Sequence, residues 1–213
     1  MADSVLNQLA NALGRRDEAP NIALAEKISK TNNKNAVKEL IGLMNHKAAD
    51  IRHDAIKVLY ETGERKPELI TGYSNDFLKL LDHKDNWMKW GAMSALTVVS
   101  KVKAEAIAVH LTKILDAMDK GSVITRDHGI YILCNVASLK KYHDDCVELL
   151  FDQLQKAPVN QFPMYAEKTA EVISSSDIKR LEKILNSRQD VMEIPSKEKR
   201  INKLLKNLQS RKS

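Results

Sequence analysis

A repeat with a period of 37 residues constrains this chain more than any other feature. The segment LMNHKAADIRHDAIKVL, residues 43–59, aligns without a gap with LLDHKDNWMKWGAMSAL, residues 80–96. A second shift of 37 reaches AMDKGSVITRDHGIYIL, residues 117–133, and a weaker fourth copy lies at LQKAPVNQFPMYAEKTA, residues 154–170. Self-similarity at such a period is typical of architectures in which each unit packs mainly against its neighbours.

Each copy has the pattern of two helices. Apolar residues such as Ile51, Ala55 and Leu59 recur at helical spacing. Seven glycines, five prolines and three phenylalanines are few for a sheet protein, so we expect an all-α chain. The first helices are expected at 35–46, 75–83, 104–119 and 142–156, and the second at 50–63, 86–101, 122–139 and 160–175. A column of small residues in the second helices would let neighbouring helices approach closely: Ala55, Ala92, Gly129 and Ala166.

A two-helix unit of this length, with second helices such as ADIRHDAIKVL, resembles the HEAT repeat of the HEAT/armadillo class. The resemblance implies a right-handed α-solenoid of about five HEAT-like helical hairpins. We expect the repeat domain to cover residues 1–175, with a degenerate first pair, and a basic C-terminal helical cap or tail to cover residues 176–213.

Members of this class place an Asp near the end of the first helix and an Arg in the second, so that adjacent units are linked in a ladder. The matching columns here are Asn45, Asp82 and Asp119 in the first helices, and Arg52, Lys89 and Arg126 in the second. The basic column could instead form a stripe for phosphate. Because a polar column with acidic members repeats with the same period, we expect the structural role.

The register also assigns faces to the two tryptophans. Trp87 falls at the start of its helix, where its ring can cover the first turn. Trp90 shares a mostly polar column with His53 and Asp127, so we expect it to be partly exposed. The resemblance implies that the second helices line a concave wall. Six residues on that wall are candidates for binding a partner: His53, Lys57, Tyr60, Trp90, Tyr131 and Lys168. Alternatively, Trp90 packs along a neighbouring unit.

No motif for catalysis, cofactor or metal binding is found. The glycines form no phosphate loop, and His143 with Cys146 offers only two of the ligands that a zinc site needs. We therefore expect no catalytic residue, no cofactor and no metal, and a non-enzymatic scaffold or adaptor that binds a protein or peptide. The alternative is a nucleic-acid-binding protein, with activity like that of DNA glycosylases built from HEAT-like repeats as a variant. In that variant, Asp127 is the acid nearest the aromatic residues.

The positive charge lies in the tail. Residues 177–213 hold eleven Lys/Arg and five Asp/Glu, whereas residues 1–176 hold 23 of each sign. A neutral repeat body disfavours phosphate tracking, but nucleic acid could bind through the basic tail.

We expect a last helix from Pro195 with one apolar stripe, Ile201, Leu204, Leu205 and Leu208. It could cap the solenoid, dock a partner or contact an anionic surface. No signal peptide or membrane span is recognisable, so we expect a cytoplasmic protein without membrane contact.

Overall fold

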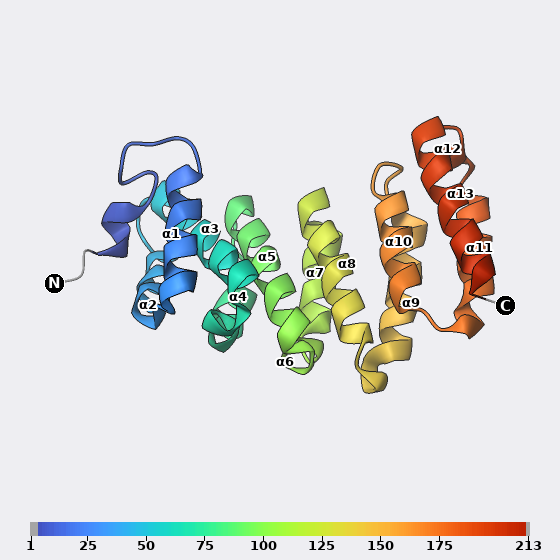
Figure 1. The fold of residues 1–213 in the computed structure, drawn as a ribbon, viewed down its shortest axis with the longest axis horizontal. Coiled ribbons are helices and arrows are strands. Elements are labelled where there is room, and N and C mark those ends of the chain that lie inside the picture. The colour runs from blue at the N-terminus through green and yellow to red at the C-terminus, as the bar shows by residue number, and fades with distance from the viewer. Residues whose placement is uncertain (1–3, 212–213) are drawn as a thin grey trace. The chain divides into compact units, whose positions relative to one another are not determined.

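The computed structural model describes residues 4–211, and within that range every regular element is a helix (Figure 1). The chain forms two compact units, one that ends at Gly129 and one that begins at Ile130. We call them unit 1 and unit 2. The boundary lies inside α8 (Val123–Ala137), whose first residues belong to unit 1.

Unit 1 consists of short 3₁₀ segments and helical hairpins. Its elements are η1 (Val5–Gln8), α1 (Ala19–Thr31), α2 (Lys34–Leu43), α3 (Ala49–Arg65), η2 (Pro67–Leu69), η3 (Thr71–Tyr73), α4 (Ser74–Leu80), α5 (Asn86–Val102), α6 (Ala104–Ala108), α7 (Leu111–Lys120) and the start of α8. α2 packs on α3 and α4 packs on α5, which are the expected first and second helices. The first helix of the third repeat differs from the single helix expected at 104–119. It is divided into α6 and α7 at Val109 and His110.

The 37-residue register is confirmed by the helix starts. α3 begins at Ala49, α5 at Asn86 and α8 at Val123, so Arg52, Lys89 and Arg126 are each the fourth residue of their helix. The fourth copy departs from the register. α10 begins at Phe162, where Pro163 lies in the first turn, the one part of a helix that tolerates proline.

The second helices of unit 1 form a row in which α1 packs on α3 and α3 packs on α5 (Figure 1). Small residues on these helices allow the close approach that the sequence predicts. Ala55 and Ala92 are fully buried, and a Cβ added to Gly91 would lie 2.4 Å from Cγ1 of Ile56 on α3. α1 therefore occupies the second-helix position of the expected degenerate first pair.

Unit 2 continues with helical pairs. Its elements after α8 are η4 (Lys140–Tyr142), α9 (His143–Lys156), α10 (Phe162–Val172), η5 (Ser175–Asp177), α11 (Ile178–Ser187), α12 (Gln189–Met192) and α13 (Pro195–Ser210). α9 pairs with α10; α11 packs on α9, and α13 packs on α10 and α11. The tail thus adds one more irregular helical pair.

The predicted apolar stripe of α13 is used for packing. Ile201, Leu204 and Leu208 are buried, whereas Leu205 is half-buried. Of the three roles that the sequence left open, capping is the one that uses this stripe, because side chains buried inside unit 2 offer no apolar face to a partner or a lipid. None of the helices within residues 4–211 has the length and apolar character that a membrane crossing requires.

Candidate functional site

A cavity of about 530 Å³ opens on the second-helix row of unit 1. We call it the Trp cavity, because both tryptophans of the chain line it. Four parts of unit 1 supply its principal walls: Arg15, Arg16, Asp17 and Glu18 from the loop before α1; His53, Ile56, Lys57, Tyr60 and Glu64 from α3; Trp87, Trp90, Gly91 and Ser94 from α5; and Ile124 and His128 from α8.

An aromatic stack forms one wall of the Trp cavity. The Trp87 ring lies 5.2 Å from the Trp90 ring, tilted by 51°, and 5.7 Å from the His53 ring, nearly parallel at 28°. Trp90 is half-buried, as the sequence predicts, whereas Trp87 is 57% exposed. A large aromatic side chain held this open to solvent is typical of a contact surface for another molecule.

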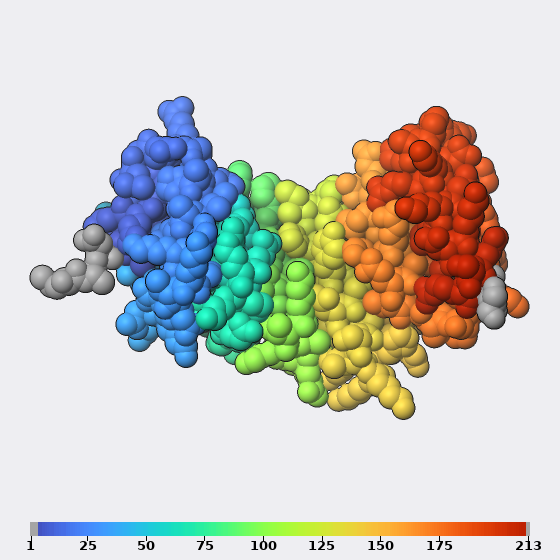
Figure 2. Space-filling view, viewed as in Figure 1, coloured from blue at the N-terminus to red at the C-terminus, as the bar shows by residue number. Residues whose placement is uncertain are grey.

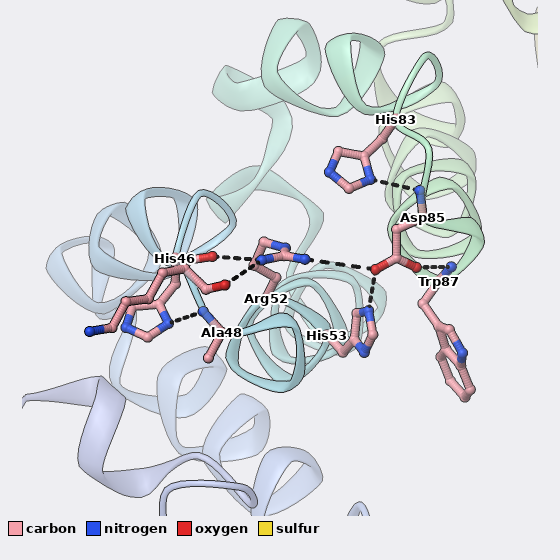
Figure 3. Close-up of polar contacts among 8 residues, drawn as sticks. His46, Ala48, Arg52, His53, His83, Asp85 and Trp87 are labelled. Atoms are coloured by element: carbon pink, nitrogen blue, oxygen red, sulfur yellow. Dashed lines mark hydrogen bonds and ion pairs between the residues drawn. The ribbon is translucent and has the colours of Figure 1, made fainter.

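Asp85 fixes the orientation of this stack (Figure 3). It is the N-cap of α5, and its Oδ1 accepts a hydrogen bond from the Trp87 backbone N–H at 3.0 Å. Its Oδ2 accepts from His53 Nε2 at 2.6 Å, so one carboxylate connects α3 to the start of α5. Partial burial raises the pKa of Asp85, but the hydrogen bonds from His53 and Trp87 outweigh it and hold this pKa below its usual value.

The repeated histidines shape the loops beside this wall. His46 Nδ1 accepts from the backbone N–H of Ala48 at 3.2 Å, and His83 Nδ1 accepts from that of Asp85 at 3.0 Å (Figure 3). The sequence identity of His46 and His83 across the repeat therefore has a structural cause. Both rings hold the turn that leads into a second helix.

A buried carboxylate holds the loop that forms the opposite wall. Asp54, 7% exposed, accepts hydrogen bonds from the backbone and side chain of Asn11 at 2.7 and 3.1 Å through Oδ2. Its Oδ1 accepts from Asn21 Nδ2 at 2.7 Å, while Asn21 Oδ1 accepts from the Ala10 N–H at 2.9 Å. A buried carboxylate satisfied in this way anchors backbone, and here it ties the segment before α1 to α3.

Lys57 holds the same wall in place through two ion pairs. Its Nζ lies 2.9 Å from Glu18 Oε2 and 3.0 Å from Glu61 Oε1. Burial alone would lower the pKa of Lys57, but its bonds to Tyr60, Glu18 and Glu61 raise the pKa above its usual value. Its charge is therefore neutralised within the protein, and Lys57 positions the loop.

His128 lines the cavity and is neutral at pH 7. Its Nε2 lies 2.9 Å from Ser94 Oγ, and its Nδ1 lies 3.1 Å from Thr97 Oγ1. Burial, together with the nearby charge of Lys101, lowers the pKa of His128 to about 4. Ser94 donates its own proton to the Trp90 carbonyl at 2.9 Å, so this hydroxyl serves the packing of α5.

Four of the six predicted binding residues, His53, Lys57, Tyr60 and Trp90, line the Trp cavity. The other two belong to unit 2, where Lys168 Nζ lies 5.8 Å from the centre of the Tyr131 ring and pairs with Glu171. Asp127, the acid considered for a glycosylase-like reaction, is not among the residues that line the cavity. Within residues 4–211, no group of three or more His, Cys, Asp or Glu side chains could hold a metal ion.

The expected inter-repeat ladder has different partners from those the sequence suggests. Arg52 donates through Nη1 to the carbonyls of His46 and Lys47, and Arg126 donates through Nε to the carbonyl of Met118. His46 and Lys47 lie in the turn between α2 and α3, and Met118 lies in the last turn of α7, so each arginine binds backbone at the junction between a first helix and its second helix.

The carboxylates that pair with basic side chains also differ from the predicted ones. The acid near Arg52 in the next repeat is Asp85, whose carboxylate lies 4.0 Å from Nη2 of Arg52, and Asp82 pairs with Lys113 at 2.6 Å. Asn45, Lys89 and Asp119 take part in none of the ion pairs found within residues 4–211. The basic column has a structural role at Arg52 and Arg126, through contacts that the period alone does not identify.

Sequence reasoning missed three parts of the cavity. Trp87 was assigned to its own helix start, although its spacing of three from Trp90 places both rings on one side of α5. The loop from Arg15 to Glu18 lies outside the repeat, so no register applies to it. His128 occupies the same repeat position as the buried Asp54 and Gly91, a column of inward-facing residues that could have indicated it.

The chain was compared with known proteins. No protein-family model matches it, and no curated protein does. Solved structures do match. An engineered protein from a structural genomics consortium has a TM-score of 0.64 at 20% identity, with 98% of each chain covered. A designed armadillo repeat protein in complex with the peptide (KR)4 has a TM-score of 0.67 at 17% identity, covering 95% of this chain and 99% of that one.

A computationally designed armadillo repeat protein for modular peptide recognition has a TM-score of 0.64 at 17% identity, covering 86% of this chain and 90% of that one. At these identities the similarity concerns the fold. It confirms the all-α solenoid that the 37-residue repeat predicts. The protein has the fold of an armadillo/HEAT-type helical repeat.

Proposed function

We propose that this protein is a non-enzymatic scaffold that binds a peptide segment of another protein, and that the Trp cavity is its principal contact site. The observation that carries the proposal is the aromatic stack of His53, Trp87 and Trp90, open to solvent beside a cavity of about 530 Å³. This volume falls in the range of about 300–1,000 Å³ that is usual for ligand sites.

The composition of the walls supports binding through an anchor side chain. Ile56 and Gly91 add apolar lining to that of the tryptophans, and Ile124, 42% exposed, contributes further apolar surface. Charged residues of the loop form the rim. An apolar centre within a polar rim is the usual arrangement of a protein-binding hot spot, in which tryptophan is enriched.

The polar groups of the cavity support a binding role more than a catalytic one. The Asp54 carboxylate is saturated by Asn11 and Asn21, and Lys57 is neutralised by Glu18 and Glu61. The Ser94 hydroxyl donates to a backbone carbonyl, although His128 lies next to it. Groups committed to packing in this way do not supply the free nucleophile that acyl transfer requires. Two of the structural neighbours are described in terms of peptide binding, which also favours a peptide as the occupant.

The proposal can be tested with a readout specific to the site. Both tryptophans of the chain line the Trp cavity, so intrinsic tryptophan fluorescence reports on this cavity alone. Peptides selected against the immobilised protein from a random library should change that emission on binding. In calorimetric titrations, Trp87→Ala should weaken the selected peptides by at least tenfold, because a central aromatic anchor typically contributes about 2 kcal/mol or more.

Val109→Ala is the matched control, since Val109 is also exposed and apolar but does not line the cavity. This variant should bind the peptides as the unmodified protein does. Trp87→Ala should fold normally, because its side chain is mostly exposed. Selected peptides that bind Trp87→Ala with unchanged affinity, or a library that yields no binder, would contradict the proposed function.

A further inference from the structure

The arginines and lysines of the C-terminal segment have different roles. All four arginines of the described tail bind within unit 2. Arg180 pairs with Glu148, Arg200 with Glu167 and Arg188 with Asp190. Arg211 donates to the carbonyls of Ala170 and Ile173 at 2.6 and 3.1 Å. Arginine is suited to such bidentate and carbonyl contacts, and Arg180, Arg200 and Arg211 attach the last helices to α9 and α10.

The four lysines of α13 form no side-chain hydrogen bond or ion pair within residues 4–211, and three of them are exposed: Lys199, Lys203 and Lys206. Their spacing of four and three residues places them in one stripe along the helix. We call this the lysine stripe. It lies along the side of α13 opposite the buried Ile201 and Leu208, on a helix that reaches the molecular surface (Figure 2).

Several lysines on other helices pair with an acid three or four residues away, as Lys30 does with Glu26 and Lys120 with Asp116. The lysines of the stripe form no such pair within residues 4–211. Like charges at a spacing of four instead destabilise a helix by about 0.2–0.5 kcal/mol. The single acid beside the stripe, Glu198, accepts a hydrogen bond from Asn202 at 3.4 Å. Packing of α13 requires only its buried face, so it does not account for a repulsive row of lysines on the other face.

We propose that the lysine stripe binds the phosphate backbone of a nucleic-acid duplex, independently of base sequence. From Lys199 to Lys206 the helix rises about 10.5 Å, at 1.5 Å per residue, so the three charges lie about 5 Å apart along the helix axis. One strand of a duplex carries one phosphate per about 3.4 Å along its axis, so the stripe spans about three phosphate intervals of one strand.

Three other anionic partners fit less well. A protein partner would need an apolar or aromatic anchor for affinity, and α13 contributes none of the exposed large apolar side chains of the described chain. A lipid surface would need apolar residues to insert, and the same observation disfavours it. Single-stranded nucleic acid is held largely by stacking on aromatic rings, which α13 lacks. A duplex backbone is bound through positive charge and requires no apolar or aromatic anchor.

The test compares two triple variants that remove the same charge. The first is Lys199→Gln, Lys203→Gln and Lys206→Gln. The control is Lys34→Gln, Lys38→Gln and Lys47→Gln, at three exposed lysines of unit 1 that also form none of the ion pairs found within residues 4–211. Binding of a fluorescent 20-base-pair DNA duplex to the full chain is followed by anisotropy at several salt concentrations, with thermal unfolding as a check on folding.

The stripe variant should lose at least tenfold in affinity at low salt, whereas the control should change by less than twofold. The slope of log affinity against log salt should fall by about 2.7, because each phosphate that is no longer neutralised reduces the slope by about 0.9. Glu198→Gln should strengthen binding severalfold by removing the acid beside the stripe. Equal losses for both triple variants would show attraction by net charge alone and overturn the proposal. Tighter binding to poly-glutamate, to phosphatidylserine vesicles or to a single strand than to the duplex would also overturn it.

Discussion

At the scale of single residues, the chemistry of the Trp cavity depends on which charges the fold satisfies internally. Asp54, Asp85 and Lys57 each make their contacts within unit 1, and each thereby positions a wall of the cavity. The sequence identified His53, Lys57, Tyr60 and Trp90 as a common face. It could not show that Lys57 is neutralised by Glu18, because that contact joins the repeat to a loop outside it.

His128 predicts a specific dependence of stability on pH. Its pKa is about 4 in the folded protein, against 6.5 for an ordinary histidine, so the unfolded chain binds the proton more tightly. The free energy of unfolding should therefore fall as the pH is lowered from about 6.5 to 4. The loss is on the order of 3 kcal/mol, at 1.36 kcal/mol per pKa unit. Urea denaturation at a series of pH values measures it.

His128→Gln should flatten the stability curve between pH 6.5 and 4, and His110→Gln serves as the control for removal of a histidine outside the cavity. The pKa of Asp85 affects the free energy of unfolding in a separate, lower pH range. Because its folded pKa lies below the usual 3.8, its contribution is present above that value and is lost at lower pH. Parallel curves for His128→Gln and the unmodified protein between pH 6.5 and 4 would show that this histidine does not control the slope.

At the scale of elements, the row of second helices depends on close approach. Gly91 of α5 faces Ile56 of α3, and the column of Ala55 and Ala92 serves the same contact. The sequence predicted this column from the period alone, because small residues that recur at one repeat position allow each helix to lie close to the next. It did not predict the break between α6 and α7 or the late start of α10, which lie where the repeats diverge.

Two glycine substitutions should have opposite effects on stability. Gly91→Ala places a Cβ 2.4 Å from Ile56, so α3 and α5 must separate, and we expect a loss of about 1–3 kcal/mol. Gly42→Ala in α2 meets no atom within 4 Å, so the higher helix propensity of alanine should stabilise the protein by about 0.5–1 kcal/mol. Thermal or urea unfolding of both variants distinguishes them. A stabilising Gly91→Ala would mean that the helices are not in contact at this position.

At the scale of the whole molecule, repeat proteins are stabilised by contacts between neighbouring repeats. The last repeat therefore needs a capping element over its exposed apolar side. α13 provides one for α10 and α11 through Ile201, Leu204 and Leu208. The C-terminal tail, which the sequence predicts as a separate basic segment, is thus attached by its arginines, and the side chains of its apolar stripe pack against α10 and α11. Within the part of the tail that the structure describes, the lysine stripe takes no part in this attachment.

Weakening this cover should have a local effect. Ile201→Ala removes a fully buried side chain and should cost about 2–5 kcal/mol of local stability. In hydrogen-exchange mass spectrometry, exchange should accelerate most in α10, α11 and α13 and least in α1 to α3. Asn202→Ala, at an exposed position of the same helix, should leave exchange unchanged. A uniform acceleration along the chain would show that α13 stabilises the protein globally and does not act as a local cap.

The sequence by itself determined the helical class, the 37-residue register and the face on which Trp90, His53 and Tyr60 lie. A period fixes these features because every repeat buries the same positions. Only the tertiary structure decided that the loop before α1 closes a cavity over that face, that Asp85 orients Trp87, and that Arg52 and Arg126 bind carbonyls. These contacts join segments that share no period, and their partners are set by distance and burial after the helices have packed.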